Sequence, residues 1–143
     1  MRIEDLRFLV VEDHDFQRMA LTNLLTTLGA SHVHEAPNGR AALTLFQDMG
    51  RFVDIVVSDL DMPDMDGLEF IRHLGLARMP VSVILMSALG RQVIESTEVM
   101  TGAYGVKLLG ALEKPVTAAA LKALIERHDQ DDGMGAARSA CDV

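Results

Sequence analysis

The sequence predicts an α/β protein with a doubly wound (βα)5 fold, in which helices cover both faces of a five-stranded parallel sheet. Three observations support this fold class. The length of 143 residues suits one domain large enough to bury its own core. Five apolar, often β-branched runs recur along the chain, and stretches with helical spacing separate them. Most of these runs are nearly continuously apolar rather than alternating, which is typical of strands covered on both faces.

The apolar runs are the predicted strands, and the stretch after each is expected to form a helix. The strands are residues 8–11, residue 33 with its flanks, and residues 53–57, 81–86 and 106–112. The helices with clear apolar stripes carry Phe16, Met19, Ala20, Leu24 and Leu28 in the first, Ala42, Leu45, Phe46 and Met49 in the second, and Ala118, Leu121 and Ile125 in the last. Residues 92–101 show a weaker stripe. Asn38 and Thr117 suit helix N-caps, and Gly29 suits a helix C-terminus.

Residues 1–128 are expected to form a single domain. From Asp129 onward Asp, Gly, Ala and Ser dominate and the helical periodicity stops, so residues 129–143 are expected to be a flexible tail or linker. The lone cysteine, Cys141, lies in this tail. A single cysteine excludes an internal disulfide and a cysteine-ligated metal site.

Charge and hydropathy exclude several classes of partner. The longest apolar runs are far too short to span a membrane, and the acidic Glu12 and Asp13 directly follow the first run, which does not suit a signal peptide. We therefore expect a cytoplasmic protein that does not bind a membrane. Acidic residues number 21 against 13 basic ones, and the formal net charge of −8 at pH 7 disfavours direct nucleic-acid binding.

Acidic residues end two of the predicted strands. Glu12 and Asp13 follow the first strand and Asp59 follows the third. In the flavodoxin-like strand order 2-1-3-4-5 these strands are neighbours, and ligands bind beyond the carboxyl ends of the strands, so the three carboxylates are expected to share one pocket. Such a cluster is costly without a cation, and an all-oxygen set suits Mg²⁺ or Mn²⁺. The sequence therefore predicts a divalent metal site.

Two groups that bind phosphate follow the remaining strands. Ser87 ends the fourth strand and Lys114 follows the fifth, which brings a hydroxyl donor and a positive charge to the same pocket. A metal, a lysine and a hydroxyl around one carboxylate suit phosphoryl transfer to an aspartate. Asp59 lies between Asp13 on one side and Ser87 and Lys114 on the other, so it is the predicted phosphoacceptor.

Four motifs around these residues resemble response-regulator receiver domains of two-component signalling. They are Val-Val-Glu-Asp at residues 10–13, Ser-Asp-Leu-Asp-Met-Pro at residues 58–63 with Asp-Gly at residues 66–67, Met-Ser-Ala at residues 86–88, and Glu-Lys-Pro at residues 113–115. The resemblance covers residues 5–128. It implies that a sensor histidine kinase or a phosphotransfer protein phosphorylates Asp59, and that an unknown output domain or effector responds.

The same resemblance implies a role for each residue of the site. The implied ligands of Mg²⁺ are Asp13, Asp59 and the backbone carbonyl of Asp61, with Glu12 acting through water. Ser87 and Lys114 are implied to bind phosphoryl oxygens. Phosphorylation and dephosphorylation are then self-catalysed, so the chain is a phosphoacceptor rather than a conventional enzyme. A phosphorylation-dependent homodimer and a cis Lys114–Pro115 bond both stay open at this point.

Two local features refine the resemblance. Receivers often carry an aromatic switch residue three positions before the lysine, and here that position is Ala111. The segment of residues 102–115 is similar to receivers fused to EAL-type cyclic-di-GMP phosphodiesterase domains. Nothing in the chain encodes such a domain, so the output and any continuation past Val143 stay open.

Two other function classes are weighed against the receiver. The first is a haloacid-dehalogenase-type phosphatase, with Asp59 as nucleophile and Asp61 as acid/base, but that family places its second acidic pair after the lysine. The second is a pseudo-receiver that only docks to partners, and a complete acidic pocket argues against it. His14, His32 and His34 are expected to be surface residues rather than metal ligands.

Overall fold

The structure is a computed structural model, and it describes residues 2–49, 53–61, 67–78, 81–88 and 90–128. It contains one sheet of five parallel strands in the order β2-β1-β3-β4-β5. The strands are β1 (Arg7–Val11), β2 (His32–Ala36), β3 (Ile55–Asp59), β4 (Ser82–Ser87) and β5 (Lys107–Glu113). Both the predicted fold class and the predicted strand order are confirmed.

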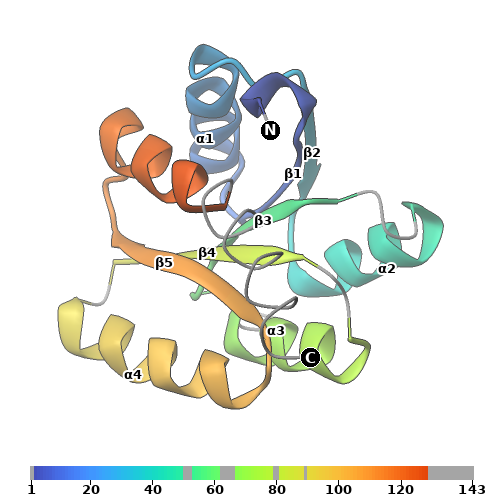
Figure 1. Cartoon of the computed structure of the whole chain (residues 1–143), viewed down its shortest axis with the longest axis vertical. Helices are drawn as coiled ribbons and strands as arrows, with labels where there is room; N and C mark the ends of the chain where they lie inside the picture. Colours follow the sequence, from blue (N-terminus) through green and yellow to red (C-terminus); the bar gives the residue numbers. More distant parts are fainter. Residues whose placement is uncertain (1, 50–52, 62–66, 79–80, 89, 129–143) are drawn as a thin grey trace, which may run out of the picture.

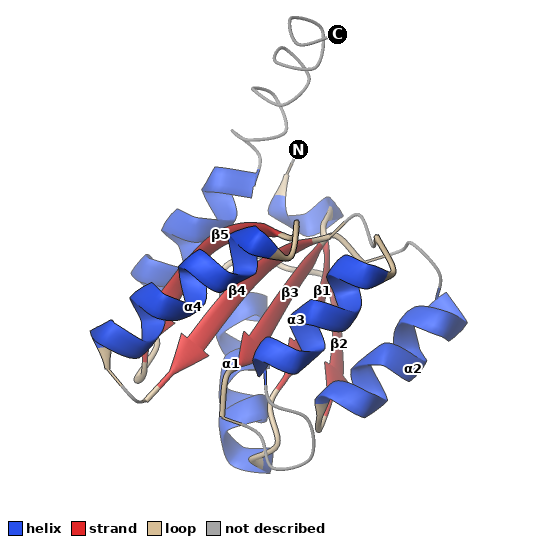
Figure 2. Ribbon diagram, turned by 90° about the horizontal axis from the view of Figure 1, so that it is seen from below, coloured by secondary structure: helices blue, strands red, loops and turns tan. Residues whose placement is uncertain are grey.

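Helices cover both faces of this sheet, as Figures 1 and 2 show. A short 3-10 helix, Ile3–Asp5, precedes β1. The helices are α1 (Asp15–Thr27), α2 (Gly39–Met49), α3 (Gly67–Leu76), α4 (Arg91–Ala103) and one over residues 118–128, here called the C-terminal helix. In Figure 1, α1 and the C-terminal helix lie on one face, and α2, α3 and α4 lie on the other.

The core forms two apolar layers, one on each side of the sheet. Alternate residues of β1 point to opposite layers: Leu9 packs with Phe70 of α3, whereas Phe8 packs with Leu121 of the C-terminal helix. Every residue of β3 and β4 is buried. Two-sided burial explains why these strands are continuously apolar in the sequence.

One predicted helix face is wrong in part: Leu24 and Leu28 of the predicted stripe pack against the core, but Phe16 and Met19 do not. The residues of α1 that are buried are Leu21 and Leu25, whereas Phe16 is 73% exposed and Met19 is 59% exposed. Apolar residues lie around much of α1, so helical spacing alone defines more than one stripe. Packing against the sheet selects the leucine stripe and leaves Phe16 and Met19 in solvent.

The predicted helix ends are confirmed. The Asn38 side-chain oxygen accepts a hydrogen bond from the Ala41 amide at 2.7 Å and caps α2, and the Thr117 hydroxyl accepts one from the Ala120 amide at 3.2 Å. Gly29 follows α1 with a φ of 112°, a left-handed conformation that favours glycine. Asn38 and Thr117 thus begin helices just beyond the carboxyl ends of β2 and β5.

Replacing the cap of α2 tests its contribution to stability. Asn38→Ala is expected to lower the free energy of unfolding by about 1 kcal/mol, because an orphan helix amide loses its acceptor. Urea unfolding followed by circular dichroism measures the change. Asn38→Ser is the matched control, and it should retain most of the wild-type stability. Equal losses in the two variants would show that the cap hydrogen bond is not the cause.

Two further predictions concern membrane-spanning helices and the C-terminal tail. Across the residues described here, none of the helices has the length and apolar character needed to cross a membrane. The expected tail at residues 129–143, including Cys141, lies outside the described residues. The proposed boundary at residue 128 therefore stays a prediction.

Candidate functional site

The carboxyl ends of four neighbouring strands meet at one edge of the sheet. Backbone hydrogen bonds continue the strand ladders by one residue, from the Leu60 amide to Met86 and from the Lys114 amide to Ser87, both at 2.9 Å. Ser87 is the fully buried last residue of β4, and Lys114 directly follows β5. The hydrogen bonding of the sheet therefore determines the backbone positions of Ser87 and Lys114.

Three carboxylates gather at this edge. One oxygen from each of Glu12, Asp13 and Asp59 lies within 4.8 Å of the others. Glu12 is 1% exposed and Asp59 is 2% exposed, whereas Asp13 is open to solvent. A hard divalent cation such as Mg²⁺ prefers an all-oxygen set of this kind. The convergence predicted from the strand ends is present, and the donor set fits such an ion.

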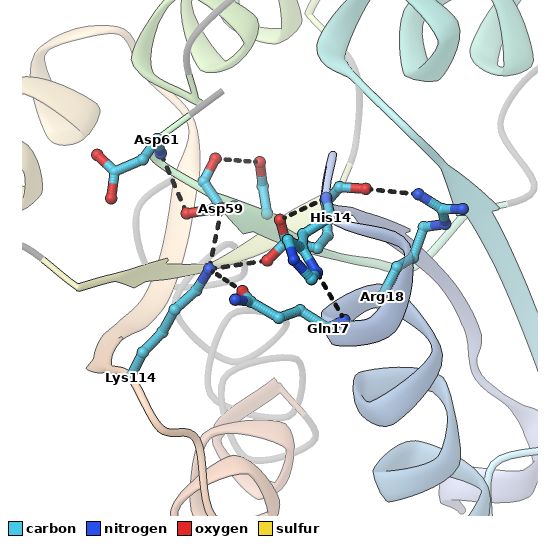
Figure 3. Close-up of polar contacts among 8 residues, drawn as sticks. His14, Gln17, Arg18, Asp59, Asp61 and Lys114 are labelled. Carbon is cyan, nitrogen blue, oxygen red and sulfur yellow. Dashed lines mark hydrogen bonds and ion pairs between the residues drawn. The ribbon is translucent and has the colours of Figure 1, made fainter. Parts of the chain in front are cut away.

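Lys114 reaches into this acidic group and contacts three side chains, as Figure 3 shows. Its Nζ lies 2.8 Å from Glu12 Oε1, 2.9 Å from Asp59 Oδ2 and 2.8 Å from Gln17 Oε1. The lysine and both carboxylates were predicted from the sequence, but Gln17 was not. Gln17 lies in the first turn of the helix that follows Glu12 and Asp13, and this position could have indicated that its side chain is near the site.

Asp61 takes a different place from the other predicted site residues. Its backbone amide donates to Asp59 Oδ1 at 3.1 Å, and its exposed carboxylate points away from Asp59 in Figure 3. That carboxylate is not in the acidic group. The predicted contribution of Asp61 to a metal site was its backbone carbonyl, and this stays a prediction. The Lys114–Pro115 bond, left open by the sequence, is cis.

Residues of α1 hold the loop that carries Glu12. The His14 amide donates to Glu12 Oε2 at 3.2 Å, and Arg18 Nη1 donates to the Glu12 backbone carbonyl at 2.9 Å. Arg18 also pairs with Asp15 at 2.7 Å and with Glu35 of β2 at 3.3 Å. His14 Nδ1 accepts from the Gln17 amide at 3.5 Å and so caps α1. His14 thus has a structural contact of its own, and its role as a residue that does not bind metal stays a prediction.

Burial and charge shift two titrations in the site. Burial raises the pKa of Glu12, and the Asp59 charge adds to the rise, against the hydrogen bonds from Lys114 and the His14 amide. For Lys114, burial alone lowers the pKa, but hydrogen bonds to Glu12 and Asp59 and their negative charges outweigh it, so its pKa lies above 10.5. Lys114 is therefore a cation at every physiological pH.

The Glu12 titration predicts how stability depends on pH. Its folded pKa is above the ordinary value of 4.5, so in the interval above 4.5 the folded state binds more protons than the unfolded state. The Glu12 contribution to stability therefore falls as the pH rises through that interval. In the metal-free protein, Glu12→Gln is expected to remove this component and to flatten the profile of unfolding free energy against pH.

Urea unfolding in EDTA, repeated from acidic to neutral pH, measures the two profiles. Glu126→Gln is the matched control, since the Glu126 carboxylate is exposed on the C-terminal helix, and its profile should follow the wild type. A Glu12→Gln profile parallel to that of the wild type would contradict the assignment.

Comparisons with known proteins define the family. Residues 8–126 match the response regulator receiver domain. The chain is 35% identical over 127 residues to the cyclic di-GMP phosphodiesterase RocR of Pseudomonas aeruginosa, an alignment that covers 89% of this chain and 32% of RocR. It therefore spans about a third of that relative. It is 32% identical over 128 residues to the chemotaxis protein CheY-3 of Vibrio cholerae, covering 87% of this chain and 92% of CheY-3.

The fold is also that of solved receivers. A response regulator from Colwellia psychrerythraea superimposes with a TM-score of 0.74 at 30% identity, covering 88% of this chain and 98% of that one. The comparisons lend no support to the haloacid-dehalogenase alternative, and the acidic pair Glu12 and Asp13 follows β1 rather than a strand after Lys114. A match over residues 8–126, together with CheY-3 along nearly its whole length, shows that the chain belongs to the response regulator receiver domain family.

Proposed function

We propose that Asp59 accepts a phosphoryl group from a phosphohistidine of a sensor kinase or phosphotransfer protein, and that hydrolysis later removes it. The observation that carries this proposal is the contact of 2.9 Å between Lys114 Nζ and Asp59 Oδ2 inside the buried acidic group. Receiver domains as a family exchange phosphoryl groups with such kinases and signal to output domains. The particular kinase of this chain is a matter for experiment.

The transfer step follows from this arrangement. A carboxylate oxygen of Asp59 attacks phosphorus and forms the P–O bond of an acyl phosphate. The P–N bond of the donor breaks, and its electron pair returns to the imidazole. Lys114 contacts Asp59 and supplies positive charge where the phosphoryl oxygens arrive. Water later cleaves the acyl phosphate, which returns aspartate and inorganic phosphate.

A divalent ion belongs to the same proposal. Asp13, Asp59 and the Asp61 carbonyl would hold Mg²⁺ or Mn²⁺, with Glu12 reaching it through water. When bound, the ion supplies the charge that offsets repulsion between the carboxylates and the incoming phosphoryl group. Lys114 supplies part of this compensation without the ion, because it contacts two of the carboxylates.

Ser87 is proposed as the residue that responds to the phosphoryl group. It ends β4 beside Asp59, and its hydroxyl would donate to a phosphoryl oxygen. Because Ala111 replaces the usual aromatic switch residue, Ser87 is expected to move toward the phosphoryl group without a partner rotation on β5. Structures with and without beryllofluoride, a phosphoryl mimic, are expected to differ around Ser87. Identical Ser87 positions would contradict this.

The output is proposed by likeness to RocR. RocR is a cyclic di-GMP phosphodiesterase, and this chain matches only about a third of it. We propose that residues 1–128 act as a receiver that controls an output domain or effector, with control of cyclic di-GMP hydrolysis as the candidate output.

Size-exclusion chromatography with and without beryllofluoride would show whether phosphorylation also drives homodimer formation.

Intact mass spectrometry tests the phosphoacceptor. After incubation with acetyl phosphate and Mg²⁺, the wild type is expected to gain one phosphoryl group, and Asp59→Asn is expected to gain none. EDTA should prevent the adduct. Asp54→Asn is the matched control at the opposite edge of the sheet, where the Asp54 carboxylate accepts from the Arg7 amide, and it should be phosphorylated normally. Acetyl phosphate hydrolysis without an adduct, or no reaction at all, would overturn the proposal.

A further inference from the structure

Gln17 is a side chain of the site that the proposed chemistry does not use. It lies in the first turn of α1, and its Oε1 is 2.8 Å from Lys114 Nζ. The same nitrogen contacts Glu12 and Asp59. We infer that Gln17 is a positioning residue that holds Lys114 in the unphosphorylated protein and yields its place to a phosphoryl oxygen. This inference rests on the proposed function.

The ammonium of Lys114 has as many acceptors around it as it has N–H donors. A lysine ammonium has three N–H donors and no acceptor. Within the described part of the chain, Lys114 has three acceptors at hydrogen-bond distance, one each from Glu12, Gln17 and Asp59. A phosphoryl oxygen on Asp59 needs one of these donors. One of the three present contacts must therefore be given up.

The weakest of the three Lys114 contacts is the one most readily released. The Glu12 side chain is charged and only 2% exposed, and charge-assisted hydrogen bonds are roughly twice as strong as neutral ones, so its release would leave a buried charge with less compensation. Asp59 loses its own charge when it becomes an acyl phosphate, but its side chain is only 3% exposed, so water would not readily replace Lys114 at its remaining oxygen. Gln17 is neutral and exposed, so water can satisfy its carboxamide after release. Gln17 is the contact that yields.

The Gln17 side chain has space beside it when it is released. A cavity of about 420 Å³ lies between α1 and the loop after β5. Gln17 and Lys114 lie at its edge, together with the apolar residues Leu24 and Val116. This space is available to the carboxamide when it leaves Lys114. The hydrogen bond from the Gln17 amide to His14 keeps the backbone in place, so only the side chain needs to move.

Gln17 therefore competes with the phosphoryl group for one donor of Lys114. Removing the competitor should favour the phosphorylated form, and strengthening it should favour the unphosphorylated form. Gln17→Met has a similar length and no acceptor oxygen, whereas Gln17→Glu has a charged acceptor. Both residues are good helix formers, so both variants should fold.

Beryllofluoride titration in Mg²⁺, measured by NMR, tests the inference. Gln17→Met is expected to bind beryllofluoride about fivefold more tightly, since a neutral hydrogen bond contributes about 1 kcal/mol. Gln17→Glu is expected to bind it more weakly. Asn23→Met, an exposed amide replaced two turns further along α1, is the matched control and should bind like the wild type.

The NMR signals of Lys114 give a readout that a purely structural role would not change. Without beryllofluoride, the Lys114 signals of Gln17→Met should differ from those of the wild type. With it, the two should coincide, because residue 17 then provides no acceptor to Lys114 in either protein. Equal or weaker binding by Gln17→Met, or signals that still differ when bound, would overturn the inference alone. A wild type that neither binds beryllofluoride nor forms the acetyl phosphate adduct would overturn the proposed function, and this inference with it.

Discussion

Lys114→Met is expected to abolish phosphorylation of Asp59 and to lower the unfolding free energy of the metal-free protein by about 3 kcal/mol at neutral pH. Lys114 Nζ pairs with Glu12 at 2.8 Å and with Asp59 at 2.9 Å, and both carboxylates are almost fully buried. Without the lysine, two neighbouring negative charges lose their counterion. The loss of stability should be smaller at acidic pH, since the raised pKa of Glu12 lets this carboxylate take up a proton more readily than an ordinary glutamate.

The lysine contribution also has an alkaline limit. Because the folded pKa of Lys114 is above 10.5, its stabilisation is complete below 10.5 and is lost as the pH rises through the folded value. Urea unfolding in EDTA, from acidic pH to above pH 10.5, measures the stability change, and intact mass after acetyl phosphate treatment measures the loss of phosphorylation. Lys122→Met, an exposed lysine on the C-terminal helix, is the matched control. A Lys114→Met variant as stable as this control would contradict the assigned role.

Mg²⁺ should separate the contribution of Lys114 to stability from its role in phosphorylation. The lysine competes with a cation for Glu12 and Asp59, so Lys114→Met is expected to bind Mg²⁺ more tightly than the wild type. Bound Mg²⁺ should then restore part of the lost stability, because ligand binding to the folded state alone stabilises it. Phosphorylation should not return, since the positive charge beside the phosphoryl oxygens is still missing.

Gly75→Ala is expected to destabilise the protein by about 2 kcal/mol, because overfilled contacts force the backbone to shift. Gly75 lies in α3, and a methyl group there would overlap the backbone carbonyl oxygen of Tyr104, which follows α4. A carbonyl oxygen of the main chain cannot rotate away as a side chain can. The close approach of α3 to the turn before β5 therefore depends on glycine.

Gly102→Ala is the matched control for that prediction. Gly102 lies on the exposed side of α4, and nothing is within 4 Å of the position that its Cβ would take. Alanine is the better helix former, so this variant is expected to gain about 0.5–1 kcal/mol. Thermal and urea unfolding measure both changes. Two changes of the same sign would show that helix propensity, and not the Tyr104 contact, governs Gly75.

Much of the fold was predictable because local patterns and tertiary needs agree. The apolar runs became the five strands, and the pattern is clearest for the central β3 and β4, since strands buried on both faces need mostly apolar residues. Asn38 and Thr117 cap helices because their side chains bond to amides three residues away, a strictly local interaction. The face of α1 was not predictable in this way. Apolar residues on two stripes compete, and only packing against the sheet excludes Phe16 and Met19.

The residue types and positions of the site were determined by the sequence. Residues that directly end parallel strands must meet at one edge of the sheet, so Glu12, Asp13, Asp59, Ser87 and Lys114 could be placed together from their positions alone. Tertiary structure alone decided how the ammonium of Lys114 is shared, which brought in Gln17, and how closely Gly75 approaches Tyr104. Contacts of this kind join residues distant in the chain, and they depend on side-chain rotamers and on helix positions to within an ångström or so, which no local pattern specifies.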